Sequence, residues 1–311
     1  MKNAVPICFY PTRKIILDDD TIFSESILLK MEGKFFSSYT SPHLLLNYLL
    51  KEYSPILRKT DLFGIEQADS ELSMHHNFHI PTKKLNSIVS NTVPYDISVI
   101  LVDYHMPNMT GIDFLNQIKS YPCKKILITG EQDYVLGIDA LNAGLIDAYI
   151  RKDDPDLLNK LNNFVTALEW KYFTDLSAYA YNLSDLDYLS NSDFIEKFEQ
   201  FIAENKIMAF FLENKEGDFS GFNSNGRKFI SIRSRKQLQE LSILAKEDGA
   251  SKEIVNYLER AEVIPFFGNK KHWEIPAAEW GKFLYSANLI VDDSDFVGAF
   301  IANHSLYVSN D

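Results

Sequence analysis

The chain has 311 residues, of which 46% are hydrophobic, and this length and composition predict two globular domains that each bury a core. Its formal net charge of -12 disfavours binding to nucleic acid by general attraction to phosphates. Only Cys8 and Cys123 are present, so no disulfide framework is expected. The N-terminal segment lacks the apolar core of a signal peptide and no apolar run could span a bilayer, so we expect a cytoplasmic protein without a membrane partner.

The first predicted element is an apolar strand at residues 14–17, which runs directly into Asp18, Asp19 and Asp20. A helix is predicted over 44–50. Acidic residues at the end of a buried strand indicate either a helix cap or a polar site at the edge of a sheet.

An insertion of roughly 45 residues, 51–96, follows this helix and exceeds ordinary connection lengths. Because it leaves the end of a helix and enters the start of a strand, we expect it at the face opposite the acidic residues. His75, His76 and His79 within it have the spacing of zinc ligands on a helix. No nearby cysteine or acid completes that set, so surface histidines are favoured over a metal site.

Three further apolar strands follow the insertion, and each leads to a polar residue. They are predicted at 99–102, 126–128 and 148–150, and beyond their ends lie Asp103, Thr129 and Lys152, respectively. Helices predicted over 112–118 and 135–143 form the crossovers of a doubly wound parallel sheet. Ligands of such sheets bind outside the carboxyl ends of the strands, so these residues should share one pocket with Asp18 and Asp19.

The residue types in this pocket predict phosphoryl chemistry. Clustered carboxylates repel one another unless a hard cation joins them, and Mg²⁺ prefers a few carboxylates with water and phosphate oxygens. An ionised Asp103 could then attack a phosphoryl group, while Lys152 neutralises its oxygens. Each residue alone also fits a helix cap, a turn or a solvated charge. Their coincidence at four strand ends favours the shared site.

The segments ISVILVDYHMPNMTGIDFLNQIK, KKILITG and DAYIRK resemble the receiver domain of two-component response regulators, up to about residue 165 and apart from the insertion. The resemblance implies that a sensor histidine kinase is the partner and that the catalytic residues are Asp103, which is phosphorylated, Thr129 and Lys152. It implies Thr129 and Tyr149 as a switch pair. It also implies Mg²⁺ as the cofactor, bound by Asp19, by Asp18 through water, by Asp103 and by the main-chain carbonyl of His105. Receivers usually have proline after the lysine, whereas this chain has Asp153, so this loop departs from the family pattern.

We therefore expect an α/β fold with a five-stranded doubly wound parallel receiver sheet at 1–169, interrupted by the insertion. A connector helix is expected at 170–181, because the helical pattern of 155–170 continues into an aromatic-rich stretch. The remainder, 182–311, is predicted to be an α+β output domain with a mainly antiparallel sheet.

The output domain is predicted to contain short strands, a turn at Asn225-Gly226, and several amphipathic helices. The helices are expected at 194–202, 236–246 and 253–260, and the strands at 207–212, 217–222, 229–232, 263–267, 287–291 and 296–302.

Candidate sites in the output domain are weak. Its basic cluster comprises Arg227, Lys228, Arg233, Arg235 and Lys236, for which a solvated hairpin edge is favoured over an anion or nucleotide site. An interface aromatic is favoured for His272-Trp273-Glu274, and a charged turn for Asp292, Asp293 and Asp295. No three-helix DNA-binding block, phosphate loop or hydrolase motif is present, so we expect neither a DNA-binding nor an enzymatic output.

The overall layout also resembles the quorum-sensing response regulators of Legionella-type bacteria, which leaves a nucleotide-binding-like output possible. We expect a response regulator that is phosphorylated on Asp103 and signals through a non-DNA-binding output, by phosphorylation-dependent homodimerisation. Two alternatives for the output stay open: a module that binds a nucleotide or another small molecule, and an atypical DNA-binding domain of a transcription factor.

Overall fold

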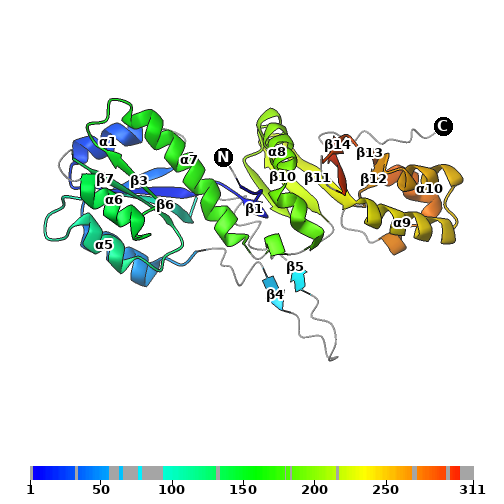
Figure 1. The fold of residues 1–311 in the computed structure, drawn as a ribbon, viewed down its shortest axis with the longest axis horizontal. Helices are drawn as coiled ribbons and strands as arrows, with labels where there is room; N and C mark the ends of the chain where they lie inside the picture. The colour runs from blue at the N-terminus through cyan, green and yellow to red at the C-terminus, as the bar shows by residue number, and fades with distance from the viewer. Residues whose placement is uncertain are drawn as a thin grey trace. The chain divides into compact units, whose positions relative to one another are not determined.

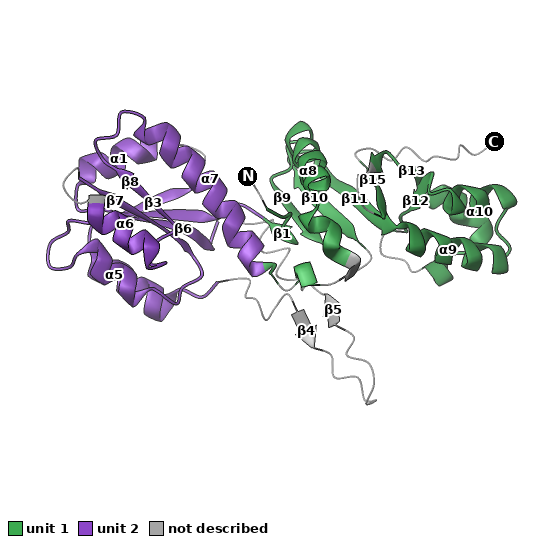
Figure 2. Ribbon diagram, in the orientation of Figure 1, with its two compact units in different colours: residues 1–9, 59–80, 177–311 green, residues 10–58, 81–176 purple. Residues whose placement is uncertain are grey.

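The computed structural model describes residues 3–31, 34–55, 63–65, 76–78, 94–130, 134–178, 180–182, 184–214, 217–267, 272–291 and 295–301. The chain divides into two compact units (Figure 2). The parallel unit comprises residues 10–58 and 81–176, and the antiparallel unit comprises residues 1–9, 59–80 and 177–311. No helix in these described ranges is long and apolar enough to cross a membrane.

The parallel unit contains a five-stranded parallel sheet in the order β3-β2-β6-β7-β8 (Figure 1). Its strands are β2 (Arg13–Leu17), β3 (Phe36–Tyr39), β6 (Ile97–Asp103), β7 (Lys124–Thr129) and β8 (Ala148–Arg151). Its helices are α1 (Thr21–Lys30), α2 (Pro42–Asn47) with a π-helical continuation (Tyr48–Glu52), α5 (Gly111–Gln117), α6 (Tyr134–Asn142) and α7 (Leu157–Leu176). This order confirms the predicted doubly wound sheet.

Alternate residues of the strands face two separate cores. Leu17, Ile100 and Val102 pack with α2, α5 and α6 on one face of the sheet. Ile16 and Leu101 pack with residues of α1 and α7 on the other face. Every residue of β6 is buried, which explains the continuous apolar run at residues 99–102, directly before Asp103.

The antiparallel unit contains a six-stranded antiparallel sheet in the order β1-β9-β10-β11-β15-β14 (Figure 1). Its strands are β1 (Cys8–Phe9), β9 (Ala209–Leu212), β10 (Asp218–Asn223), β11 (Gly226–Ser234), β14 (Leu289–Ile290) and β15 (Phe296–Ile301). Two smaller pairs are β12 (Val263–Pro265) with β13 (Leu284–Ser286), and β4 (Phe63–Ile65) with β5 (His76–Phe78). The α-helices are α8 (Ser192–Glu204), α9 (Arg235–Glu247) and α10 (Lys252–Glu259), with short 3₁₀ helices at Ala180–Asn182, Ser184–Ser190, His272–Glu274 and Ala277–Phe283.

The predicted α+β character of this unit is confirmed. Helices of the unit pack with its strands in two apolar clusters. Phe198 of α8 packs on Phe210 and Phe219 of the sheet with ring centroids 5.0 and 5.4 Å apart. Leu238 of α9 and Leu258 of α10 belong to a second cluster that includes residues of β12, β13 and β15.

The units divide the chain differently from the expected domain boundaries. Residues 1–9 belong to the antiparallel unit, because β1 pairs with β9. Helix α7 runs without interruption to Leu176, so the expected boundary at 169/170 falls inside a helix, and residues 170–176 of the expected connector belong to α7. Trp170, Tyr172 and Leu176 are buried, which explains the aromatic-rich extension of its pattern.

Parts of the insertion form β4 and β5, while His75, His79 and residues 79–93 lie outside the described residues. Asp292 and Asp293 also lie outside them. The expectations of surface histidines and of a charged turn at these positions therefore stay predictions.

Candidate functional site

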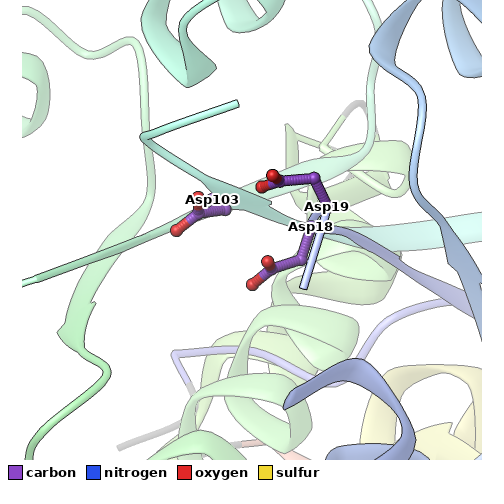
Figure 3. A group of neighbouring side chains, drawn as sticks. All are labelled: Asp18, Asp19 and Asp103. Atoms are coloured by element: carbon purple, nitrogen blue, oxygen red, sulfur yellow. The ribbon is translucent and has the colours of Figure 1, made fainter. Parts of the chain in front are cut away.

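The acidic site lies where two neighbouring parallel strands end. Leu17 of β2 pairs with Val102 of β6, so the residues that follow, Asp18 and Asp103, lie side by side. Carboxylate oxygens of Asp18, Asp19 and Asp103 all lie within 4.8 Å of one another (Figure 3). The predicted grouping of these three acids is thus present in the structure.

Lys152 brings a cation to two of these acids. Its ammonium lies 2.8 Å from Oδ2 of Asp18 and 2.9 Å from Oδ1 of Asp103. The main-chain N–H of Lys152 donates to the carbonyl of Thr129 at 2.8 Å, which fixes the loop that follows β8. Its ammonium also lies 4.9 Å from the ring centroid of Phe23, within the range of a cation–π contact.

Burial and the contacts with Lys152 have opposite effects on the pKa values of this group. Loss of solvation raises the pKa of both Asp18 and Asp103, and their contacts with Lys152 offset only part of that effect. For Lys152, burial lowers the pKa, but the hydrogen bonds and charges of the two acids outweigh it and the pKa is raised. One ammonium against three carboxylates leaves two uncompensated negative charges when all the groups are ionised. A divalent cation would neutralise this excess.

Asp20 has a different role from its two neighbours. Its side chain caps α1 by accepting hydrogen bonds from the N–H groups of Ile22 and Phe23 at 3.0 and 3.1 Å. The N–H of Asp20 in turn donates to Oδ1 of Asp18 at 2.9 Å, which orients that buried carboxylate toward the site.

Gly111 shapes the loop after Asp103, and sequence reasoning did not single it out. A Cβ at this position would lie 2.3 Å from the main-chain oxygen of Asp103. The N–H of Gly111 donates to the carbonyl of Tyr104 at 2.9 Å, which closes the loop that carries the exposed His105. The signal for this role was the glycine at the start of the predicted helix, directly after Thr110, which caps that helix.

Thr129, the last residue of β7, lies next to Tyr149 of β8. Their hydroxyl oxygens are 3.2 Å apart, and the Thr129 hydroxyl also lies 3.1 Å from the carbonyl oxygen of Gly130. The structure thus brings together the two residues that the sequence predicts as a switch pair.

Comparison with known proteins identifies this arrangement. Residues 75–162 match the response regulator receiver domain family, a range that includes Asp103, Thr129, Tyr149 and Lys152. The chain contains a response regulator receiver domain.

Over its whole length, the chain is similar to the structure of the Legionella pneumophila response regulator LqsR. The match covers 100% of this chain and 93% of that one, with a TM-score of 0.79 and 26% identity. A curated relative, protein-glutamate methylesterase/protein-glutamine glutaminase 2 of Syntrophomonas wolfei, is 35% identical over 77 residues. That match spans 24% of this chain and 22% of the relative's length.

The receiver loop after Lys152 contains Asp153 in place of the usual proline, and an ion pair holds it. The guanidinium of Arg151 binds both carboxylate oxygens of Asp153, with N–O distances of 2.9 and 2.5 Å. The ammonium of Lys152 still reaches Asp18 and Asp103, so the departure from the family pattern leaves that contact intact.

The basic residues beyond the receiver domain do not form one exposed patch. Arg233 is buried and pairs with the buried Asp218, with an N–O distance of 2.8 Å. Arg227 pairs with Glu213 and lies against the rings of Phe222 and Phe229. The predicted hairpin location is right for Arg227, Lys228 and Arg233 of β11, whereas Arg235 and Lys236 lie in α9. The expectation of a solvated edge is wrong for Arg233, because its charge is neutralised inside the unit.

Proposed function

We propose that this chain is a response regulator that accepts a phosphoryl group on Asp103 from a sensor histidine kinase. The observation that supports this most directly is the position of Asp103 at the end of the central strand, beside two acids and within 2.9 Å of the Lys152 ammonium. We place it among signalling proteins rather than enzymes that act on other substrates. The similarity to a methylesterase covers too little of that protein to support an enzymatic output.

The donor set fits Mg²⁺. Asp18, Asp19 and Asp103 would hold the ion, with the main-chain carbonyl of His105 as a further ligand. Carboxylate and carbonyl oxygens are the ligands that Mg²⁺ prefers, and the excess negative charge favours a dication. Bound there, Mg²⁺ would supply positive charge next to the phosphoryl oxygens.

The chain's own residues then account for the transfer. A carboxylate oxygen of Asp103 attacks phosphorus and forms a P–O bond, while the bond from phosphorus to the donor breaks and its electron pair leaves with the donor. Lys152 lies close enough to neutralise a phosphoryl oxygen during this step. Thr129 provides a hydroxyl that can donate to the product.

Incubation with acetyl phosphate and Mg²⁺, followed by intact-protein mass measurement, tests this assignment. We expect addition of one phosphoryl group to the native chain and none to Asp103→Asn, because an amide cannot act as the nucleophile. Asp156→Asn is the matched control, since it makes the same change at an exposed acid. Equal labelling of Asp103→Asn and the native chain would refute the assignment.

We further propose that phosphorylation shifts the protein from monomer to homodimer through α6. The small residues of this helix, Gly137 and Ala140, are buried, while its large apolar residues are exposed to solvent. Those side chains are between 40% and 51% exposed and comprise Val135, Leu136, Ile138 and Leu141. A contiguous apolar surface of this kind favours association with a second copy.

Light scattering across micromolar concentrations tests the dimer. The phosphorylated chain should show a higher mass than the unphosphorylated chain, and Ile138→Ser should lower the dimer fraction without reducing phosphorylation. Asn142→Ser at the exposed end of the same helix is the control. An unchanged mass on phosphorylation would favour an intramolecular effect on the output unit instead.

For the antiparallel unit, we propose a protein-interaction or dimerisation role, with nucleic acid disfavoured as a partner because of the chain's net charge of -12. The paired states of Arg227 and Arg233 support this role over that of an anion site. The layout that resembles quorum-sensing regulators of Legionella-type bacteria, together with the full-length similarity to a Legionella response regulator, supports a role in quorum sensing. A thermal-shift panel of nucleotides tests the rival small-molecule role, since a ligand of the folded state must raise the melting temperature.

A further inference from the structure

Helix α6 contacts the switch residue Tyr149 at a glycine. A Cβ built on Gly137 would lie 2.4, 2.6 and 2.9 Å from ring carbons of Tyr149. Carbon atoms that are not bonded do not approach so closely, so the ring can lie where it does only because residue 137 has no side chain. Gly137 has no positive φ, and therefore its backbone conformation does not itself require glycine.

This contact fixes the Tyr149 hydroxyl next to Thr129. With the ring against Gly137, the two hydroxyl oxygens are 3.2 Å apart. A hydroxyl group can accept one hydrogen bond while it donates another. Tyr149 can therefore donate to the Thr129 oxygen while the Thr129 hydroxyl donates to a phosphoryl group on Asp103.

We propose that Gly137 is a positioning residue that seats the Tyr149 ring beside Thr129 and so couples Thr129 to α6. The inference rests on the proposed phosphorylation of Asp103 for its role in signalling, but the seating itself exists in the unphosphorylated protein. A methyl group at residue 137 forces either the ring to rotate or α6 to move outward. Rotation of the ring carries the Tyr149 hydroxyl away from Thr129, whereas movement of α6 breaks the contact between the helix and the ring.

Gly137→Ala and Gly130→Ala form a matched pair of variants. Gly130 follows Thr129 directly, and a Cβ there meets nothing within 4 Å. Both substitutions add one methyl group near the switch, but only Gly137→Ala should displace Tyr149. Alanine is a better helix former than glycine, so Gly137→Ala is not expected to unfold α6.

The position of Tyr149 can be followed by fluorine NMR on protein labelled with 3-fluorotyrosine, with its resonance among the 16 tyrosines assigned by Tyr149→Phe. Gly137→Ala should shift the Tyr149 resonance, whereas Gly130→Ala should leave it in place. Identical Tyr149 resonances in the native chain and Gly137→Ala would overturn the proposal. This measurement needs no phosphoryl donor, so it stands even if the proposed phosphorylation fails.

A double-variant comparison tests the link to Thr129. Thr129→Val removes the hydroxyl and should shift the Tyr149 resonance in the native background, but add little once Gly137→Ala has separated the two side chains. Thr129→Ala provides the same comparison if valine disturbs folding. Equal shifts in both backgrounds would show that Gly137 does not hold the pair together.

The signalling consequence has a separate readout. Gly137→Ala should retain phosphorylation on Asp103, because Asp18, Asp19 and Lys152 are unchanged, but lose the phosphorylation-dependent increase in mass. In a Tyr149→Ala background the ring is absent, so Gly137→Ala should change the dimer fraction no further. A normal mass increase in Gly137→Ala with a displaced Tyr149 would overturn the coupling.

Discussion

The ammonium of Lys152 lies between the carboxylates of Asp18 and Asp103, two of the proposed Mg²⁺ ligands. Its ammonium contacts both carboxylates at less than 3 Å and so offsets part of their mutual repulsion. In the phosphorylation that we propose, positive charge at this position would serve two purposes: it stabilises the acids of the unphosphorylated protein, and it would neutralise the incoming phosphoryl oxygens.

Lys152→Met should separate these purposes. We expect the rate of phosphorylation by acetyl phosphate to fall by about 100-fold or more, the cost typical of losing one group that stabilises developing charge. Mg²⁺ affinity should stay equal or rise, because a competing cation is removed. Mass measurement over time and isothermal titration with Mg²⁺ check the two effects, with Lys160→Met as the surface control. A parallel loss of both properties would mean that Lys152 acts mainly by keeping the site folded.

The ionisation of Asp218 should make the stability of the antiparallel unit depend on pH. Burial acts to raise the pKa of this carboxyl, but Arg233 and hydrogen bonds from Asn214 and Ser231 outweigh burial and hold the pKa below its usual range. Its contribution to stability is therefore fully present above the ordinary aspartate pKa of about 3.9 and is lost as the pH falls through the lower folded value.

The expected result is acid-induced unfolding of the antiparallel unit below about pH 4 that depends on Asp218. Asp218→Asn should cost about 3–5 kcal/mol at neutral pH, because it leaves the Arg233 charge buried without its partner. In this variant, the free energy of unfolding should also decrease less steeply as the pH falls below about 4. Urea unfolding at several pH values, followed by tryptophan fluorescence, measures both. If the variant lost stability with falling pH as steeply as the native chain does, other carboxyls would be responsible for the acid-induced unfolding.

Among the elements, those with strong local patterns were predictable from the sequence, whereas the edge strands β3 and β1 were not. The continuous apolar run of β6 predicted its burial, and the small residues after Ile128 ended β7 where expected. By contrast, β3 has the sequence FSSY, is only partly buried and joins the sheet by pairing with β2. Strand β1 has two residues and pairs with β9, which is far away in sequence. Such pairings are not encoded locally.

Helix α7 is fastened to the parallel sheet by a buried ion pair. The ammonium of Lys14, in β2, lies 2.5 Å from Oε1 of Glu169, which also accepts a hydrogen bond from the Thr12 hydroxyl at 2.5 Å. Burial lowers the pKa of Lys14, and Glu169 offsets part of that effect. The Lys14 ammonium also donates to the carbonyl of Thr12 at 3.0 Å, and Glu169 is the carboxylate that pairs with its charge.

Glu169→Ala should destabilise the parallel unit by about 3–5 kcal/mol, since it leaves the Lys14 charge in the core without its partner. Replacing both partners by apolar residues, Lys14→Met with Glu169→Leu, should recover most of that loss. Urea denaturation of these variants provides the comparison, and Glu25→Ala is the control, because it makes the same change at an exposed position of α1. A double variant as unstable as Glu169→Ala would show that the unpaired charge is not the cause.

In the whole chain, the insertion separates Asp18 and Asp19 from the sequence motif that contains Asp103. The match to the receiver family begins at residue 75 and therefore excludes Asp18 and Asp19. The pairing of β2 with β6 in the folded structure brings these two acids next to Asp103. The motif after the insertion predicted the fold of this unit, whereas the antiparallel unit carries no comparable motif. Its charged residues Arg227 and Arg233 are satisfied by acids of the same unit, so they leave little signal for a ligand.

The net charge of -12 predicts how the proposed dimer should respond to salt. Two copies of an acidic chain repel each other, and added salt screens that repulsion, with a Debye length of about 10 Å at 0.1 M ionic strength. The dissociation constant of the phosphorylated dimer should therefore fall as sodium chloride increases. Sedimentation equilibrium measures this trend. A dimer that weakens with salt would point to complementary charges in the interface rather than the apolar face of α6.

The pairing of β1 with β9 has a consequence for how the protein is made. Residues of the first strand leave the ribosome before the entire parallel unit, yet Cys8 and Phe9 pair with Phe211 and Phe210, which are translated much later. The parallel unit can complete its fold on the nascent chain, while the first strand must wait for its partner. A fragment that starts at residue 177 would lack this strand and leave one edge of β9 open to pairing with other chains. We therefore expect β1 to protect the edge of β9 from pairing with other chains, in addition to extending the sheet.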